Sequence, residues 1–286
     1  MLMKPDTHAI EALARMALME DAPWGDITTE ALVPTDLRIS AQLVAREEGV
    51  LCGEDIFCTA MSMTGPVTVK FLKRDSEPFA AGDVLANLNG PAHSILRAER
   101  VGLNFVQRLS GIASQTAKYV AETKGTKARI VDTRKTTPGL RLLERYAVRC
   151  GGGHNHRFSH SDALLAKDNH LAALRTSDGD DLTSRLRAAF ACLPHTTHKE
   201  VEVDSLEQIE AVLAAGVDTI MLDNFSAADL RIGVTQIAGR ALIEASGGVS
   251  LDQVREIADA GVDLISVGAL THSVRSIDLG LDFLKS

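Results

Sequence analysis

The sequence predicts a mixed α/β protein in which a small α+β domain, residues 1–115, precedes an α/β barrel, residues 116–272. Three observations support this fold class. After residue 128, short apolar runs alternate with helical segments, which is typical of parallel strands joined by right-handed crossovers. The residues before that point mix helices and strands without this alternation. Polar or glycine residues follow the apolar runs, as expected where barrel strands end at a binding site.

The first domain should contain both helices and strands. Apolar positions at helical spacing predict a helix over residues 7–19 and a second over residues 93–119. Alternating stretches with few helix breakers predict strands within three ranges, residues 38–52, 67–72 and 82–90. The C-terminal tail, residues 273–286, is expected to pack back onto this domain.

The second domain should contain six strands with helices between them. The apolar runs that predict these strands are residues 128–131, 163–166, 199–203, 219–222, 241–243 and 263–267. Capping boxes beginning at Ser205, Ser226 and Ser250 predict where three of the helices start. An open doubly wound sheet would show the same alternation, but its usual G-x-G-x-x-G fingerprint is missing, so a closed barrel of the TIM kind is favoured.

Composition excludes several classes of protein. The 286 residues are 45% hydrophobic and 24% charged, which argues against general disorder. A net charge of −8 and an aromatic content of 4% argue against a nucleic-acid binder. No uncharged apolar stretch reaches the roughly 18 residues of a membrane span, and the N-terminus predicts no signal peptide. Four cysteines without a C-x-x-C pair fit a reducing, cytoplasmic setting.

Positive charge is concentrated in one segment of this acidic chain. Residues 129–167 contain eight Arg or Lys and three acidic residues, a balance of +5 that suits a small, highly anionic substrate. The residues that lie near predicted strand ends or glycines, and are therefore assigned to function, are Arg134, Lys135, Arg157 and Lys167. Helical spacing instead predicts a solvated helix face for Arg141, Arg145 and Arg149.

Three glycines, residues 151–153, are followed by His154, Asn155, His156 and Arg157. Such a glycine run allows the backbone to approach a ligand closely, although a helix C-cap followed by a loop would also explain it. The histidines, with His160 nearby, lack a complete metal-ligand pattern. A hydrogen bond between His156 and a ligand is therefore the favoured interpretation over a metal site.

Three carboxylates, Glu202, Asp223 and Glu244, stand 21 residues apart on successive predicted strands. We expect them to lie side by side around one rim of the barrel. Hard oxygen ligands of this kind suit Mg²⁺ bound together with substrate phosphates, and this interpretation is favoured for Glu202 and Asp223. For Glu244, ion pairing with a basic side chain is an equal alternative.

A phosphate cradle is predicted at the last two strands. Ser246, Gly247 and Gly248 precede a capped helix, and Gly268 ends the following strand. Glycine backbones at a helix N-terminus bind anions, although a tight βα turn would use the same residues. Cys150 has no base beside it and is interpreted as a packed thiol. Together these features suggest chemistry on a phosphorylated sugar.

The sequence resembles the quinolinate phosphoribosyltransferase family over nearly its whole length. The two most specific strings are D-T-R-K-T-T-P-G at residues 132–139 and G-G-G-H-N-H-R at residues 151–157. Further matching segments are residues 20–29, 98–104, 109–113, 167–170, 202–204, 222–224, 245–248 and 266–272.

The resemblance implies transfer of phosphoribose from phosphoribosyl pyrophosphate (PRPP) to quinolinate, with loss of CO₂ and formation of nicotinate mononucleotide for NAD biosynthesis. It also implies an N-terminal α+β sandwich and an incomplete, seven-stranded TIM-like barrel. Mg²⁺ is the implied cofactor, with no organic cofactor. The implied assembly is a homodimer with shared active sites, or a hexamer. The resemblance implies no nucleic-acid or membrane partner.

The resemblance also implies roles for individual residues. Arg100 would reach into the neighbouring subunit's site, and Arg134, His156 and Arg157 would hold the quinolinate carboxylates. Lys135 and Lys167 would contact phosphates or quinolinate, and Glu202 and Asp223 would meet the ribose hydroxyls and Mg²⁺. These last four are the expected catalytic residues. The 5′-phosphate would be bound by Ser246, Gly247, Gly248 and Gly268.

Two other functions remain as alternatives. A molybdenum-transport-associated homologue would share the fold, but the two specific strings are complete in this chain. A non-catalytic sensor of phosphate ligands would keep the basic cluster without needing Glu202 and Asp223.

Overall fold

The computed structural model describes residues 4–175 and 181–284. Residues 1–3 and 285–286, the outermost parts of the predicted first domain and tail, lie outside the described residues. Within the described residues, no helix combines the length and the apolar character needed to cross a membrane.

Contacts between residues divide the chain into two compact units. The first unit contains Met1–Ala117, Thr137–Gly152 and Val274–Ser286, and the second contains Lys118–Thr136 and Gly153–Ser273. The domain boundaries after residues 115 and 272 remain predictions. The contacts place one internal segment, Thr137–Gly152, with the first unit, whereas the sequence analysis counted it with the barrel.

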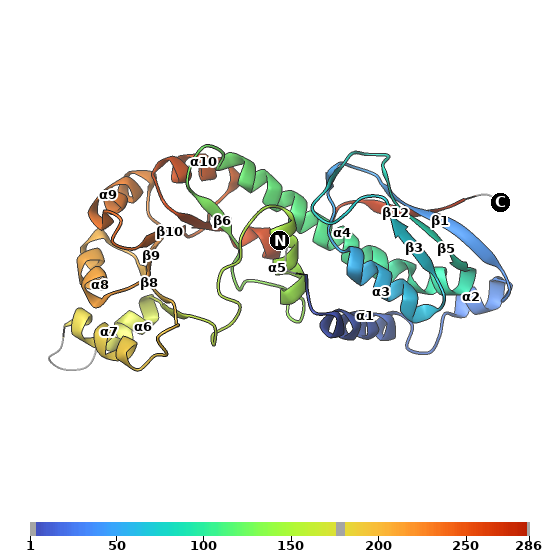
Figure 1. Ribbon diagram of the computed structural model, residues 1–286, viewed down its shortest axis with the longest axis horizontal. Helices are drawn as coiled ribbons and strands as arrows, with labels where there is room; N and C mark the ends of the chain where they lie inside the picture. The colour runs from blue at the N-terminus through green and yellow to red at the C-terminus, as the bar shows by residue number, and fades with distance from the viewer. Residues whose placement is uncertain (1–3, 176–180, 285–286) are drawn as a thin grey trace. The chain divides into compact units, whose positions relative to one another are not determined.

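The first unit is built on a four-stranded antiparallel sheet with the strand order β12-β1-β5-β3 (Figure 1). Its strands are β1 (Arg38–Ala45), β3 (Thr68–Phe71), β5 (Val84–Pro91) and β12 (Leu279–Phe283), beside a short pair β2 (Gly49–Val50) and β4 (Pro78–Phe79). Its helices are α1 (Thr7–Asp21), α2 (Ile27–Leu32), α3 (Glu54–Thr64), α5 (Arg141–Cys150) and most of α4 (Ala92–Glu122), as far as Ala117. The C-terminal strand β12 pairs with β1 and forms one edge of this sheet.

One face of this sheet carries the core of the first unit. Alternation along β1 turns Ala41, Leu43 and Ala45 to the buried side. They pack in one cluster with Phe57 of α3 and Ile95 of α4. Burying a side chain of the size of Leu or Phe contributes about 1.5–3 kcal/mol, so this face holds the helices against the sheet.

The second unit is a curved parallel sheet with the strand order β6-β11-β10-β9-β8-β7, and Figure 1 shows α8, α9 and α10 along its outer side. Its strands are β6 (Arg129–Val131), β7 (Leu164–Ala166), β8 (Lys199–Val203), β9 (Thr219–Asp223), β10 (Leu242–Ser246) and β11 (Leu264–Ser266). Its other elements are α6 (Asp168–Arg175), α7 (Leu182–Ala191), η1 (Leu206–Gln208), α8 (Ile209–Ala215), α9 (Ala227–Ile237), α10 (Leu251–Asp259) and α11 (Ala269–His272). All six predicted strands are therefore present.

The barrel is incomplete, and its seventh strand is reduced to a single bridge. Among the described residues, β6 and β7 are the two end strands of the six-stranded sheet. Beyond β6, only His154 adds a parallel bridge, opposite Val131. The His154 N–H donates to the Ile130 carbonyl at 2.8 Å, and its carbonyl accepts from the Asp132 N–H at 3.1 Å. The glycines before His154 and the polar residues after it leave no longer strand to pair.

Two of the three predicted helix starts are confirmed. Ser250 and Gln253 form a capping box at α10, and Ser226 accepts the Asp229 N–H at the start of α9. The prediction for Ser205 is wrong, because its side chain caps nothing. Gln208 instead exchanges two hydrogen bonds with Asp204, and the chain forms the 3₁₀ turn η1.

The prediction of a solvated face on α5 is wrong for Arg145, which is only 8% exposed. The neighbouring Glu144 is fully buried and accepts two hydrogen bonds from the Arg108 guanidinium, at 2.7 and 2.9 Å. Its other carboxylate oxygen accepts the Thr137 N–H at 3.1 Å. This helix is therefore packed inside the first unit rather than lying on its surface.

Candidate active site

Polar side chains gather at the carboxyl ends of the parallel strands in the second unit. Strand β8 ends beside Glu202, β9 ends at Asp223, and β10 ends at Ser246. Lys167 follows β7 directly, and the segment containing Arg134 and Lys135 follows β6. Because parallel strands bring these ends to one edge of the sheet, the predicted residues of the second unit share one side of it.

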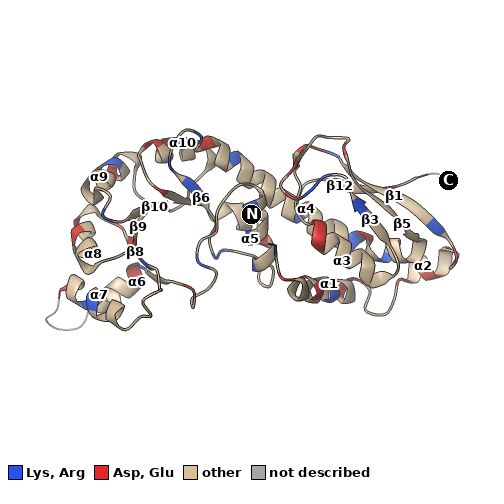
Figure 2. Cartoon of the chain, viewed as in Figure 1, with Lys and Arg blue, Asp and Glu red and all other residues tan. Residues whose placement is uncertain are grey.

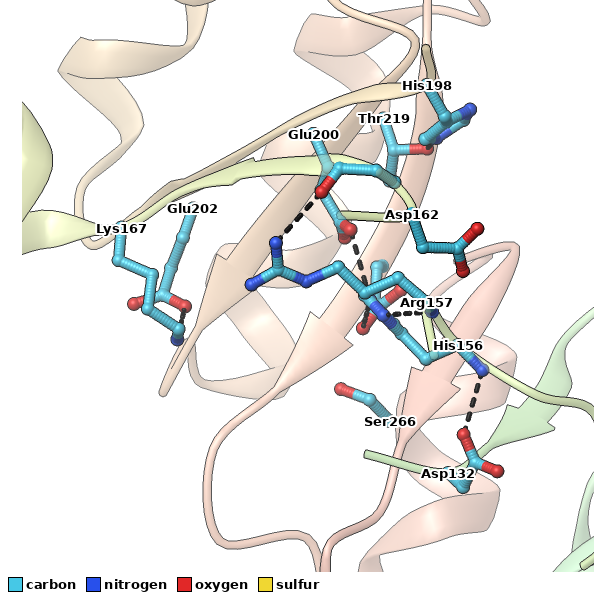
Figure 3. A network of polar contacts seen from close by, with 12 residues as sticks. Asp132, His156, Arg157, Asp162, Lys167, His198, Glu200, Glu202, Thr219 and Ser266 are labelled. Carbon is cyan, nitrogen blue, oxygen red and sulfur yellow. Dashed lines mark hydrogen bonds and ion pairs between the residues drawn. The ribbon is translucent and has the colours of Figure 1, made fainter. Parts of the chain in front are cut away.

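The acidic part of this edge forms a cavity of about 400 Å³. Glu202 and Asp223 both line it, as the sequence analysis expected. The other polar lining residues are Asp168, Asn169, Asp204, Gln208 and Asn224. Lys167 lies against this group, with its Nζ 2.5 Å from an Oε atom of Glu202 (Figure 3).

The prediction that Glu244 lies beside Glu202 and Asp223 is wrong. Glu244 is 1% exposed and does not line the cavity. Its Oε1 lies 3.5 Å from Nε2 of His156, so it belongs to a buried cluster deeper in the sheet. In the register of β9 and β10, Ser246 is opposite Asp223 and Glu244 is opposite Met221. The strand end next to Asp223 is therefore occupied by Ser246.

His156 is held on several sides by protein groups. Its main-chain N–H donates to Oδ1 of the buried Asp132 at 2.8 Å, and its Nδ1 accepts the Arg157 N–H at 2.8 Å. Its Nε2 lies 3.0 Å from Oε2 of Glu200. Figure 3 shows His156 between Asp132 and Glu200.

The charge of His156 is governed by two opposing effects. Burial lowers its pKa, whereas the hydrogen bond to Glu200 and the negative charges of Glu244, Glu200 and Asp132 raise it. The second group of effects is larger, so the pKa lies above its ordinary value. The Arg157 N–H works against the doubly protonated ring, because a protonated Nδ1 has no lone pair to accept it.

Two arginines lie at the basic part of the edge, each three residues beyond one member of the parallel bridge between Val131 and His154. Burial lowers the pKa of Arg157, and the positive charge of Arg134 lowers it further. Arg157 is anchored by a hydrogen bond from its Nη1 to the Ala163 carbonyl, at 2.9 Å. The two arginines therefore concentrate positive charge and N–H donors in this part of the edge.

The predicted phosphate cradle consists of turns that follow neighbouring strands. Gly247 has a φ of 99°, and a Cβ placed there would lie 2.3 Å from Oδ1 of Asn224. Gly248 also has positive φ, at 57°, and precedes the α10 helix. Gly268 lies beside Lys135, since an added Cβ would be 3.1 Å from Lys135 Cδ. The Thr271 hydroxyl donates to the Lys135 carbonyl at 2.7 Å and helps to fix this turn.

Two further residues bear on the site, one predicted from the sequence and one missed. Arg100 is exposed on α4 in the first unit. Glu200, which touches His156, was missed by the sequence analysis. Its position two residues before Glu202 on the same strand was the available signal, because alternate residues of a strand share a face.

Comparisons with known proteins agree over the length of the chain. The N-terminal domain of quinolinate phosphoribosyl transferase matches residues 26–110, and the C-terminal domain of the same family matches residues 112–282. The nicotinate-nucleotide pyrophosphorylase [carboxylating] of Mycobacterium leprae is 43% identical, with 99% of this chain and 100% of that protein covered.

Further relatives support the same assignment. A probable nicotinate-nucleotide pyrophosphorylase [carboxylating] of Bacillus subtilis is 38% identical over 97% of this chain and 94% of its own. The crystal structure of NadC from Streptococcus pyogenes is 39% identical and superimposes with a TM-score of 0.92, covering 99% of this chain and 100% of that one. The chain therefore belongs to the quinolinate phosphoribosyl transferase family.

Proposed function

We propose that this protein transfers phosphoribose from PRPP to the ring nitrogen of quinolinate. Carbon dioxide and pyrophosphate leave, and nicotinate mononucleotide is formed for NAD biosynthesis. Membership of the family supports this reaction, as do full-length relatives named as carboxylating nicotinate-nucleotide pyrophosphorylases.

The single observation that carries this proposal is that Arg134 and Arg157 each lie three residues beyond one member of the parallel bridge between Val131 and His154, which places both arginines at the same edge of the sheet. Quinolinate is a dianion with two carboxylates on adjacent ring carbons. A guanidinium binds a carboxylate through two parallel hydrogen bonds, which a lysine cannot reproduce. The positive charge of Arg134 lowers the pKa of Arg157, after the larger effect of burial, so a bound dianion would relieve their repulsion.

The phosphoribosyl part of PRPP would occupy the remainder of the edge. The positive φ of Gly247 and Gly248 and the N-terminus of α10 support a 5′-phosphate site, which Ser246 and Gly268 would complete. Lys135, beside Gly268, and Lys167 would neutralise phosphate oxygens or a quinolinate carboxylate. Glu202 and Asp223 would accept hydrogen bonds from the ribose hydroxyls.

Mg²⁺ fits the acidic cavity. Glu202, Asp223, Asp168 and Asp204 all line it, and hard carboxylate oxygens of this kind suit a small divalent cation that also binds substrate phosphates. Glu202 and Asp223 would hold the ion. When bound, it would neutralise charge on the departing pyrophosphate.

The protein's own groups would mainly position the substrates and stabilise charge. The breaking C–O bond leaves positive charge on the ribose, which the carboxylates of Glu202 and Asp223 favour. Arg134 and Arg157 would keep the quinolinate nitrogen facing the reacting carbon. After transfer, the ring nitrogen is cationic and stabilises the carbanion left by CO₂, and this carbanion takes a proton from solvent to give nicotinate mononucleotide. The reaction as proposed therefore uses no organic cofactor.

We further propose a cytoplasmic homodimer, or a hexamer, in which Arg100 acts in the site of the partner subunit. The exposure of Arg100 supports this role. Trp24, Ile27 and Leu32 of the first unit are 93%, 81% and 76% exposed, which supports an apolar contact surface. The four cysteines are free thiols, in keeping with a reducing compartment. Figure 2 shows Lys and Arg interspersed with Asp and Glu along the described chain.

The test is product formation by the purified protein with quinolinate, PRPP and Mg²⁺. We expect nicotinate mononucleotide, and we expect none when nicotinate replaces quinolinate, because the second carboxylate is then missing. A folded protein that forms no product from quinolinate would contradict the proposal. It would favour the molybdenum-associated or the sensor function instead.

A further inference from the structure

The buried cluster of His156, Glu200 and Glu244 lies inside the second unit, away from the cavity lining described above. Glu200 comes from β8 and Glu244 from β10, and they are 4% and 1% exposed. The two carboxylates meet the same ring nitrogen: Nε2 of His156 is 3.0 Å from Oε2 of Glu200 and 3.5 Å from Oε1 of Glu244. Figure 3 shows the contact between His156 and Glu200.

Two carboxylate oxygens in this cluster lack a hydrogen-bond partner within the described chain. They are Oε1 of Glu200 and Oε1 of Glu244. A buried carboxylate without partners is expensive, and two adjacent carboxylates avoid the cost by sharing one proton. Burial, followed by the negative charge of Glu200, raises the pKa of Glu244 to about 8. Glu244 therefore holds a proton at neutral pH, and Oε2 of Glu200 is the carboxylate oxygen that faces Nε2 of His156.

The cluster is connected to the substrate-binding end of the site through the His156 ring. In the neutral ring, the contact of Nε2 with Glu200 places the proton on Nε2 and leaves Nδ1 as an acceptor. Nδ1 accepts the main-chain N–H of Arg157 at 2.8 Å. The His156 main-chain N–H and the Asn155 side chain both donate to Asp132, at 2.8 and 2.5 Å. The backbone that carries Arg157 is thus fixed from the interior of the sheet.

We propose that Glu200 and Glu244 are positioning residues that act on quinolinate binding through His156. Glu200 fixes the orientation and tautomer of the His156 ring. Glu244 supplies the proton that stabilises the buried pair of carboxylates. The His156 ring in turn holds the backbone of Arg157. This inference rests on the proposed function, because it assigns Arg157 to quinolinate. It predicts an effect on quinolinate rather than on PRPP, because Nδ1 of His156 accepts the main-chain N–H of Arg157.

The two glutamates should respond differently to the same substitution. In Glu244→Gln, the amide donates a hydrogen bond to Glu200 as the protonated carboxyl does, so the KM for quinolinate should stay within about twofold of the wild type. In Glu200→Gln, an amide replaces the carboxylate that accepts from Nε2, and the KM for quinolinate should rise roughly tenfold with the KM for PRPP unchanged. Glu200→Asp, which withdraws the carboxylate from Nε2, should also raise it. Glu210→Gln, at the surface ion pair with Arg240, is the matched control.

The experiment combines steady-state kinetics for both substrates with ¹⁵N spectra of the His156 ring at alkaline pH. The wild type should show a protonated Nε2 and an unprotonated Nδ1, and Glu200→Gln should show the two tautomers averaged. Equal rises in both KM values, an unchanged KM for quinolinate in Glu200→Gln, or a metal ion bound at the cluster in the purified enzyme would overturn the proposal. If Glu200→Gln does not fold, the KM values of Glu200→Asp and the ¹⁵N spectra of the wild type test the proposal instead. A wild type without turnover would instead contradict the proposed function.

Discussion

At the scale of single residues, the pair of Arg134 and Arg157 makes the most specific claim about chemistry. Replacing Arg134 by Lys keeps the charge and removes the two-pronged contact with a carboxylate. The kcat/KM for quinolinate should fall roughly 10- to 100-fold, the loss expected for a charged hydrogen bond. Arg129→Lys, at the exposed start of β6, is the control and should behave as the wild type. An unchanged kcat/KM in Arg134→Lys would rule out the bidentate role.

The buried Glu244 should leave a signature in stability as a function of pH. Its pKa in the folded protein is raised from 4.5 to about 8, mainly by burial, so between these values the folded state binds more protons than the unfolded state. The free energy of unfolding therefore falls as pH rises through this window, by at most about 1.4 kcal/mol per pH unit from this group. Glu244→Gln removes that loss, and its stability relative to the wild type should grow with pH up to about 8 and then stay level.

Denaturant unfolding at several pH values measures this difference. Glu210→Gln is the control, because the hydrogen bond from Arg240 lowers the pKa of Glu210. Its stabilising effect is already complete above the ordinary pKa of a glutamate, so the Glu210→Gln difference should be flat over the same window. A flat Glu244→Gln difference would show that Glu244 is ionised like a surface carboxylate.

The positions of the site residues could be predicted from the sequence only in part. The spacing of 21 residues placed Glu202, Asp223 and Glu244 on successive strands correctly. The spacing did not predict how deeply each side chain is buried. The register between neighbouring strands decides which residue reaches the carboxyl edge of the sheet, and on β10 this residue is Ser246. The pairing of Glu200 with His156 joins residues far apart in the chain, and no local pattern encodes it.

At the scale of elements, the turn after β10 makes a separate prediction. Gly247 combines a φ of 99° with a close approach to Asn224, so Gly247→Ala is both strained and crowded. We expect a loss of about 1–2 kcal/mol in stability from the backbone strain, and a KM for PRPP that rises roughly tenfold as the turn shifts. Thermal unfolding and steady-state kinetics measure the two effects.

Gly216 provides the matched comparison for this turn. It has a φ of 85° at the end of α8, and a Cβ there would meet nothing within 4 Å. Gly216→Ala should therefore cost stability without changing the KM for PRPP. If both variants leave this KM unchanged, the Gly247 turn does not bind the phosphate.

Elements themselves were predictable because their signals are local. Apolar runs placed all six strands of the second unit, and serine caps placed the starts of α9 and α10. The failure at Ser205 is instructive, since Asp204 is one residue earlier and competes for the same Gln208. The single bridge at His154 depends on pairing with β6 and has no periodicity of its own.

At the scale of the whole molecule, the proposed shared active site can be tested by mixing variants. Arg100→Ala and Asp223→Asn should each be nearly inactive as homodimers. In mixed dimers, one of the two sites contains both substitutions and the other contains neither. Dissociating and reassociating the two variants in equal amounts should therefore restore about a quarter of the wild-type activity. No recovery, with mixed dimers demonstrated, would place Arg100 in the site of its own subunit.

Long-range organisation was the least accessible part of the fold. The assignment of Thr137–Gly152 to the first unit depends on packing such as the Arg108–Glu144 ion pair, in which Glu144 is fully buried. A helical pattern of arginines on α5 indicated a solvated face, because the sequence does not show which other segments cover it. Contacts of this kind follow from the tertiary structure alone.

The central claim is that Arg134 and Arg157 together recognise the quinolinate dianion. A crystal structure of the protein with quinolinate bound tests it most directly. The account predicts that each guanidinium lies within hydrogen-bonding distance of a quinolinate carboxylate, with the ring nitrogen directed toward the cavity lined by Glu202 and Asp223. Quinolinate bound without contact to one of the two arginines, or with its nitrogen turned away from that cavity, would contradict it.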